Sequence, residues 1–157
     1  MKIINFLLPV LIFFSIISCF DNTDTTYDKK SVQQMLIRYA EAWRLKDIDL
    51  FDDLFSDDRD MVILDGNSSE RFIGWISWKQ RLQKHFGSFE NVDISYENTV
   101  IKISKSGKFS WLSCIVNTEY TYKGKPGIMN GLRMTWVLEK RNKKWTIVHA
   151  HFSFPKE

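Results

Sequence analysis

Two adjacent runs of alternating side chains constrain the fold of this chain more than any other feature. Residues 131–138 and 145–154 are rich in β-branched and aromatic side chains, and a polar break at residues 141–144 separates them. A break of that length suits a tight hairpin turn, with Asn142 and Lys143 between the two runs. The sequence therefore predicts an antiparallel pair of strands on which the rest of the chain packs.

Alternation along these strands separates an apolar row from a mixed row, because neighbouring side chains of a strand point to opposite faces. The apolar row is assigned Leu132, Met134, Trp136, Leu138, Thr146, Val148, Ala150, Phe152 and Phe154. The mixed row is assigned Arg133, Thr135, Val137, Glu139, Trp145, Ile147, His149, His151 and Ser153. Helices must cover an apolar side, so we expect the apolar row inside the domain and the mixed row outside. In the alternative arrangement, the mixed row lines a pocket and supplies general acid or base groups.

Length and charge point to one domain and argue against a nucleic-acid partner. With 157 residues, 44% of them hydrophobic, the chain can bury one core but is too short to favour two domains. Its 22 basic and 19 acidic residues are interspersed, and a solvated turn explains the basic cluster at residues 140–144. No nucleic-acid-binding motif accompanies the charge, so we expect no nucleic acid among the partners.

The beginning of the sequence has the composition of a targeting segment. Met1-Lys2 precedes an apolar run at residues 3–17, which is typical of a secretory signal peptide. The sequence Ile16-Ile17-Ser18-Cys19 resembles the bacterial lipobox, in which the cysteine is acylated. We therefore predict a lipoprotein signal peptide at residues 1–18 and a lipid anchor at Cys19. The expected location is the bacterial cell envelope, either periplasmic or at the cell surface.

A polar segment separates this region from the predicted domain. Residues 19–30 contain Asp, Asn and Thr in place of an apolar period, so we expect a flexible tether there. The domain is predicted to span residues 31–157. If Cys19 is acylated, Cys114 is the one remaining thiol, and its alternation with apolar neighbours predicts a small buried residue and not a nucleophile.

Three helices are expected in the first half of the domain. A capping-box pattern at Ser31 opens a helix whose apolar stripe includes Tyr39 and Trp43. A second, short helix is expected at residues 49–55. A third is predicted to begin with a capping box at Ser77 and to end at Gly87 in a left-handed cap.

Strands account for the rest of the domain. Residues 61–64 and 71–74 are predicted to form two short strands, and residues 92–104 and 108–122 two long ones before the final pair. Helices segregated from an antiparallel sheet define an α+β fold.

This order of elements resembles the SnoaL-like branch of the nuclear transport factor 2-like superfamily over roughly residues 31–154. The resemblance rests on Arg38-Tyr39, the segment 54–58, Gly74, the pattern Arg133-x-Thr135 and the closing strand 145–153. It implies a cone, in which a strongly curved antiparallel sheet wraps around about three N-terminal helices and leaves a pocket. The fold hosts isomerases, cyclases, dehydratases, hydrolases and binding modules, so individual residues must decide the function.

The same resemblance assigns a catalytic group to one position. Ketosteroid isomerases of this superfamily use a tyrosine of the first helix as an oxyanion donor, and Tyr39 stands at the matching place. Their catalytic aspartate corresponds to Ile63, with Asp60 and Asp65 near but not matched. Their second oxyanion carboxyl corresponds to Thr135 or Trp136.

These patterns leave three hypotheses. The first is a membrane-tethered domain that binds a small apolar molecule in a pocket lined by Tyr39, Trp43, Met134, Trp136, Val148, Ala150 and Phe152. The second is an acid/base isomerase, cyclase or dehydratase in which Tyr39 acts with His149 or Asp60. The third is a non-catalytic envelope protein that binds a partner.

The mixed row carries two further expectations. The superfamily often dimerises through the outer side of its sheet, so Arg133, Thr135, His149 and His151 are predicted to form the contact of a homodimer. His149 and His151 lie two apart and could share a metal ion, but the sequence offers no third ligand at a convincing spacing. We therefore predict no metal site and no cofactor.

Overall fold

The computed structural model describes residues 25–66 and 71–155. The predicted signal peptide and the predicted anchor at Cys19 lie outside the described residues. The elements run α1 (Thr25–Leu45), α2 (Ile48–Leu54), β1 (Val62–Leu64), β2 (Arg71–Ile73), α3 (Trp75–Phe86), β3 (Phe89–Ile103), β4 (Phe109–Tyr122), β5 (Lys125–Arg141) and β6 (Lys144–Ser153). Among the described helices, none is long and apolar enough to cross a bilayer.

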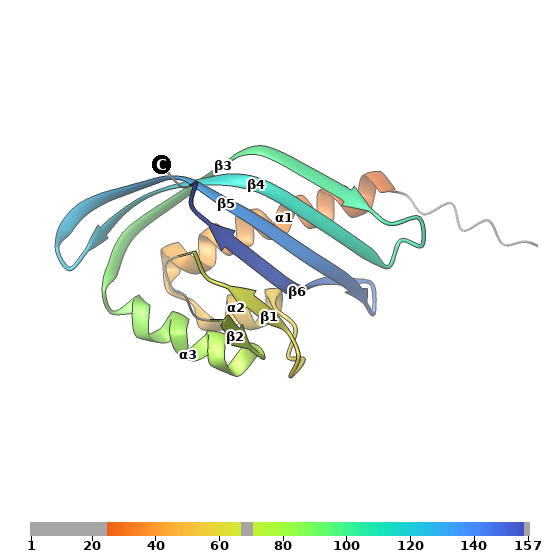
Figure 1. The fold of residues 1–157 in the computed structure, drawn as a ribbon, viewed down its shortest axis with the longest axis horizontal. Coiled ribbons are helices and arrows are strands. Elements are labelled where there is room, and N and C mark those ends of the chain that lie inside the picture. Colours follow the sequence, from red (N-terminus) through yellow and green to blue (C-terminus); the bar gives the residue numbers. More distant parts are fainter. Residues whose placement is uncertain (1–24, 67–70, 156–157) are drawn as a thin grey trace, which may run out of the picture.

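One six-stranded sheet, in the order β2-β1-β6-β5-β4-β3, curves over the three helices (Figure 1). The long strands pair antiparallel, and β1 joins β6 in parallel. On the concave side, the Tyr96 hydroxyl of β3 donates a hydrogen bond to the Leu36 carbonyl of α1 (2.9 Å). The predicted α+β class and curved antiparallel sheet are confirmed.

Interruptions of the strand register produce the curvature. Bulges or shifts interrupt β3 between Glu90 and Asp93 and between Glu97 and Val100, and a third lies in β4 between Val116 and Thr118. An extra residue bends its strand and increases the local twist. Near the third shift, Gly131 of β5 has a positive φ of 78°, a backbone conformation that residues with a side chain rarely adopt. The sheet therefore curls instead of lying flat.

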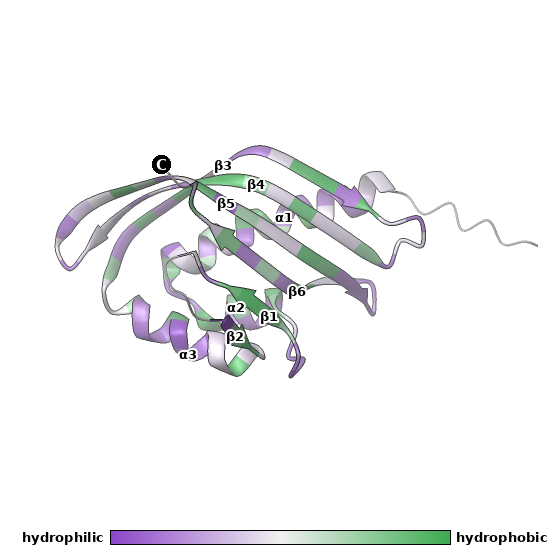
Figure 2. Ribbon diagram, viewed as in Figure 1, coloured by the Kyte–Doolittle hydropathy of each residue, from purple (hydrophilic) through white to green (hydrophobic). Residues whose placement is uncertain are grey.

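The predicted closing hairpin is confirmed. Met134 pairs with Phe152 and Trp136 with Ala150, and Asn142 and Lys143 form the turn with φ of 49° and 67°. Two consecutive positive φ values are typical of the type I′ turn, whose twist matches that of the flanking strands. Figure 2 shows the resulting alternation of apolar and polar residues along the long strands.

One part of the predicted face assignment is wrong. Leu138 pairs with Ile147 whereas Val137 pairs with His149, so Val148 is an extra residue in β6. This bulge reverses the faces of the first part of the strand. Trp145 and Ile147 are buried in the core instead of lying on the mixed row, and Val148 is only partly buried.

The first helix begins earlier than predicted. Residues 25–30 are helical and not a tether, and Ser31 is not a cap, because its hydroxyl donates to the Tyr27 carbonyl within the helix. Asp28 holds this first turn in place. Its carboxylate is 2% exposed, lies 2.5 Å from Lys140 Nζ and accepts a hydrogen bond from Trp145 Nε1 (3.2 Å). The ion pair joins two residues that lie far apart in the sequence, so the polar composition of residues 19–30 alone could not predict it.

Both predicted caps of the third helix are also wrong. Gly74, with a φ of 75°, precedes the helix, and Ser77 lies in its first turn, where its hydroxyl donates to the Ile73 and Gly74 carbonyls. Gly87 has a right-handed φ of −68°. The chain turns there directly into β3, with the Ser88 amide bound to the His85 carbonyl (2.8 Å), so no left-handed residue is required.

We expect Asp28→Ala to lower the free energy of unfolding by about 3 kcal/mol, because it leaves the partly buried Lys140 ammonium and the Trp145 N–H without their acceptor. Urea unfolding measures the change. Asp53→Ala is the matched control, since Asp53 forms exposed ion pairs with Arg38 and Lys144, and should stay within about 0.5 kcal/mol of the parent. Equal losses in the two variants would contradict the structural role of Asp28.

Candidate functional site

A cavity of about 360 Å³ lies between α1, α3 and the concave face of β3, β4 and β5. Aromatic and aliphatic side chains form most of its wall, and a smaller group of polar side chains lies on the side of α3 and the end of β1. Pockets of this size and composition are typical of small-molecule sites.

The structure divides the seven residues that were predicted to line a pocket. Tyr39, Trp43, Met134 and Phe152 lie on the wall of the cavity. The other three do not. Trp136 and Ala150 are fully buried in the core, and the bulge removes Val148 from the inner row. Contact of the first four residues with a ligand stays a prediction.

Tyr39 is held between aromatic rings. Its ring centroid lies 5.3 Å from that of Trp136 and 5.4 Å from that of Phe51, both in edge-to-face geometry. Burial raises the pKa of the Tyr39 hydroxyl strongly, and a hydrogen bond from the Trp43 side chain only partly opposes this. The hydroxyl therefore stays protonated at physiological pH and can act as a hydrogen-bond donor in the cavity.

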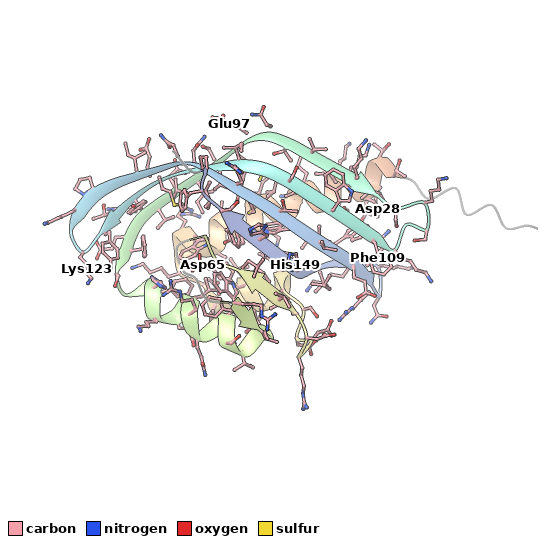
Figure 3. The ribbon with its side chains drawn as sticks, in the orientation of Figure 1. Asp28, Asp65, Glu97, Phe109, Lys123 and His149 are labelled. Carbon is pink, nitrogen blue, oxygen red and sulfur yellow. The ribbon has the colours of Figure 1, made fainter. Side chains whose placement is uncertain are left out.

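The polar side of the cavity contains an ion pair and a histidine. Arg81 Nη2 lies 3.2 Å from Asp65 Oδ2, and both side chains are largely shielded from solvent. His85 follows Arg81 by four residues on α3, so the two side chains share one face of the helix. Asp65 follows β1 directly and reaches the same cavity; Figure 3 labels it.

His85 is kept neutral. Burial lowers the pKa of its imidazole below the usual value, and the positive charge of Arg81 acts in the same direction, while Asp65 opposes them. Its Nε2 atom is buried and has no hydrogen-bond partner among the described residues, and the same holds for Nε1 of Trp78, which also lines the cavity. A neutral imidazole can accept a proton or a hydrogen bond, so His85 is the candidate base of this cavity.

The predicted catalytic partners of Tyr39 lie elsewhere. His149 is on the outer row of β6, opposite Val137, and Asp60 is exposed in the loop before β1. Neither lines the cavity. The proposed combinations of Tyr39 with His149 or Asp60 therefore do not come together in this structure.

Sequence reasoning missed Arg81 and His85, and named Asp65 only as a neighbour of an unmatched position. A signal was present for His85. Trp78, Leu82 and His85 recur at helical spacing, so an extended apolar stripe on the third helix would have placed His85 on the inner face.

The remaining candidates can also be placed. Arg133, Thr135, His149 and His151 lie on the outer face of the sheet, with Thr135 directly opposite His151. Cys114 is buried, as predicted, and burial raises the pKa of its thiol to about 12, so it is not a thiolate nucleophile. Among the described residues, no three His, Cys, Asp or Glu side chains come together as a metal site.

Comparisons with known proteins agree with this architecture. Residues 32–157 match the SnoaL-like domain family. A nuclear transport factor 2-like superfamily protein from Salmonella enterica superposes with a TM-score of 0.74 at 18% identity, over 85% of this chain and 94% of that one. A candidate aromatic ring hydroxylase from Novosphingobium aromaticivorans gives a TM-score of 0.73 at 19% identity, over 84% and 92% of the two chains.

A third similar structure is a candidate scytalone dehydratase, also from Novosphingobium aromaticivorans. It superposes with a TM-score of 0.73 at 14% identity, over 84% of this chain and 87% of that one. At these identities the superpositions establish the fold alone. No functionally curated protein gives a significant sequence match to this chain.

Proposed function

The chain belongs to the SnoaL-like domain family, and we propose that it binds a small, largely apolar molecule in the cavity between α1, α3 and the sheet. One observation carries the proposal. A cavity of about 360 Å³ is walled by aromatic and aliphatic side chains on most of its surface and by polar side chains on one side. Such an arrangement binds an apolar body by burial and orients it through a few polar contacts.

The polar side indicates what such a molecule should contain. Trp78 Nε1 and the Tyr39 hydroxyl are hydrogen-bond donors, and His85 Nε2 has no partner among the described residues. A carbonyl or hydroxyl oxygen on the ligand would satisfy these groups. Because Arg81 is already paired with Asp65, the cavity favours an uncharged oxygen over a free carboxylate.

An acid/base enzyme is the second candidate, and the state of His85 favours it. A neutral imidazole in this largely apolar cavity can remove a proton from a carbon next to a carbonyl, while a protonated Tyr39 donates a hydrogen bond to the carbonyl oxygen. Return of the proton to another carbon completes an isomerisation, and loss of a neighbouring hydroxyl with that proton completes a dehydration.

Two features of the wider protein belong to the same proposal. Acylation at Cys19 would tether the domain to a membrane of the bacterial envelope, as the lipobox-like sequence suggests. A second copy of the chain would cover the outer face of the sheet at Arg133, Thr135, His149 and His151, where polar side chains could pair across the interface.

We expect Met129→Trp to weaken binding of the neutral aromatic probe N-phenyl-1-naphthylamine at least tenfold, because the larger ring fills part of the cavity that Met129 lines. A fluorescence titration measures the affinity. Ile128→Trp is the matched control, since Ile128 is the neighbouring residue of the same strand but is 67% exposed and does not line the cavity. Undiminished binding by the Met129 variant would place the probe outside the cavity.

If the protein is an enzyme, His85→Gln should lower kcat/KM by a factor of about 100 or more while the aromatic probe still binds. The activity should fall as the pH drops through the pKa of His85, which lies below the usual 6.5, because the protonated imidazole cannot act as a base. Deuterium exchange from solvent into any small molecule that co-purifies with the protein, followed by NMR, measures the reaction. Exchange that persists in the variant would remove His85 from the mechanism.

Sedimentation of the chain at micromolar concentration tests the dimer. We expect a dimer for the parent and a monomer for Arg133→Glu combined with His151→Glu, because like charges would face one another across the interface. Lys125→Glu, in the hairpin between β4 and β5, should leave the dimer intact. A monomeric parent would overturn this interface.

A further inference from the structure

One end of the molecule is basic and aromatic. The first turns of α1, the turn between β3 and β4 and the turn between β5 and β6 lie together there (Figure 1). We call this surface the basic tip and define it by the exposed residues Tyr27, Lys29, Lys30, Lys105, Lys108, Phe109 and Lys143. Figure 3 labels Phe109 and Asp28 at this end and Lys123 at the opposite end.

The three segments of the basic tip are fixed to one another. The Lys140 amide of β5 donates to the Lys108 carbonyl (2.8 Å), which joins two of the segments at the sheet. The Lys140 side chain and the Trp145 indole both bind the buried Asp28 carboxylate of α1. The basic tip is therefore a preformed surface and not a set of independent loops.

No carboxylate of the described residues pairs with the lysines of the basic tip. Two described carboxylates near the tip are paired with other residues, Asp28 with Lys140 and Glu139 with Arg141. Asp21 and Asp24, just upstream in the sequence, still leave the lysines in excess.

Two exposed aromatic side chains accompany the charge. Tyr27 is 67% exposed and Phe109 is 49% exposed, an unfavourable position for large apolar rings in water. Aromatic rings next to lysines suit the headgroup region of a bilayer, where the rings enter the interface and the ammonium groups meet anionic lipids. An acidic protein partner could pair with the lysines. It would not explain why this surface lies so few residues from the predicted lipid anchor at Cys19.

The segment upstream of α1 ends at this surface. Only residues 20–24 lie between Cys19 and Thr25, where α1 begins, and the six Cα–Cα steps from Cys19 to Thr25 span at most about 21 Å in any conformation. If Cys19 carries a lipid, the basic tip cannot be far from the bilayer surface. A lipid chain and a polybasic patch reinforce one another in membrane binding.

We propose that the basic tip docks the domain on the anionic surface of a lipid bilayer. The inference rests on the proposed acylation of Cys19 but not on ligand binding in the cavity. Docking fixes the orientation of the domain, with the hairpin around Lys123 at the end away from the membrane. Tyr120 and Tyr122, which line the cavity, belong to the strand that leads into that hairpin, so the cavity faces the aqueous side.

Spin labels on the full acylated chain test this orientation. The chain is placed in vesicles of phosphatidylcholine with or without phosphatidylglycerol, and a nitroxide is attached to Ser106→Cys, in the β3–β4 turn, or to Lys125→Cys, in the far hairpin. Cys114 is buried, so the introduced thiol is labelled selectively. Power saturation reports access to oxygen and to a water-soluble nickel complex, and flotation reports vesicle binding.

We expect phosphatidylglycerol to lower access of the nickel complex to the Ser106 label several-fold and to leave the Lys125 label unchanged. Lys105→Glu combined with Lys108→Glu should restore access, since each lysine near an anionic surface contributes about a fivefold factor in binding. Lys123→Glu combined with Lys125→Glu, assayed with the Ser106 label, is the matched control and should have no effect.

Three results would overturn docking. If the chain floats with the vesicles but the Ser106 label stays accessible to the nickel complex, the lipid alone holds the chain. A Ser106 label protected equally in detergent and in both vesicles is covered by a second copy of the chain. If the chain floats with neither kind of vesicle, the anchor and the docking proposal are both wrong. The aromatic-probe titration tests the cavity separately.

Discussion

The architecture depends on bending strands of up to 17 residues over one long helix. A flat sheet of this length would contact α1 along its whole face and leave no hollow. Register shifts in β3 and β4 and the positive φ of Gly131 instead curve the sheet around the helices. Tyr39 packs against Trp136 in the core and also lines the cavity between the helices and the curved sheet.

The sequence predicted those parts of the fold that depend on local periodicity. The closing hairpin, the α+β order and the inner row from Leu132 to Leu138 follow from a period of two and from turn composition, so they agree with the structure. The bulge at Val148 could not be foreseen, because an extra residue leaves the composition of a strand unchanged. The start of α1 depends on Asp28 meeting Lys140, more than a hundred residues away, and no local pattern contains that contact.

In the candidate site, too, local patterns revealed some residues, whereas others come together only in the tertiary structure. The sequence pointed to Tyr39 because it lies on the apolar stripe of the first helix and at a place matched by the family resemblance. Asp65, Arg81 and His85 come together only because α3 folds back beneath the sheet beside the end of β1. Their proximity is a property of the tertiary structure, so the sequence directed attention to His149 instead, which the pleat of β6 places on the other side.

The unsatisfied atoms of the cavity wall give the strongest physical reason to expect a ligand. Among the described residues, buried side-chain nitrogens without a hydrogen-bond partner occur at Trp78, His85 and Trp136, and the first two line the cavity. Each such group costs about 1–3 kcal/mol relative to a hydrogen-bonded one. Core packing alone would be served better by apolar side chains at both positions. A bound molecule with suitably placed oxygen atoms would remove that cost, so its binding would stabilise the fold as well as fill the cavity.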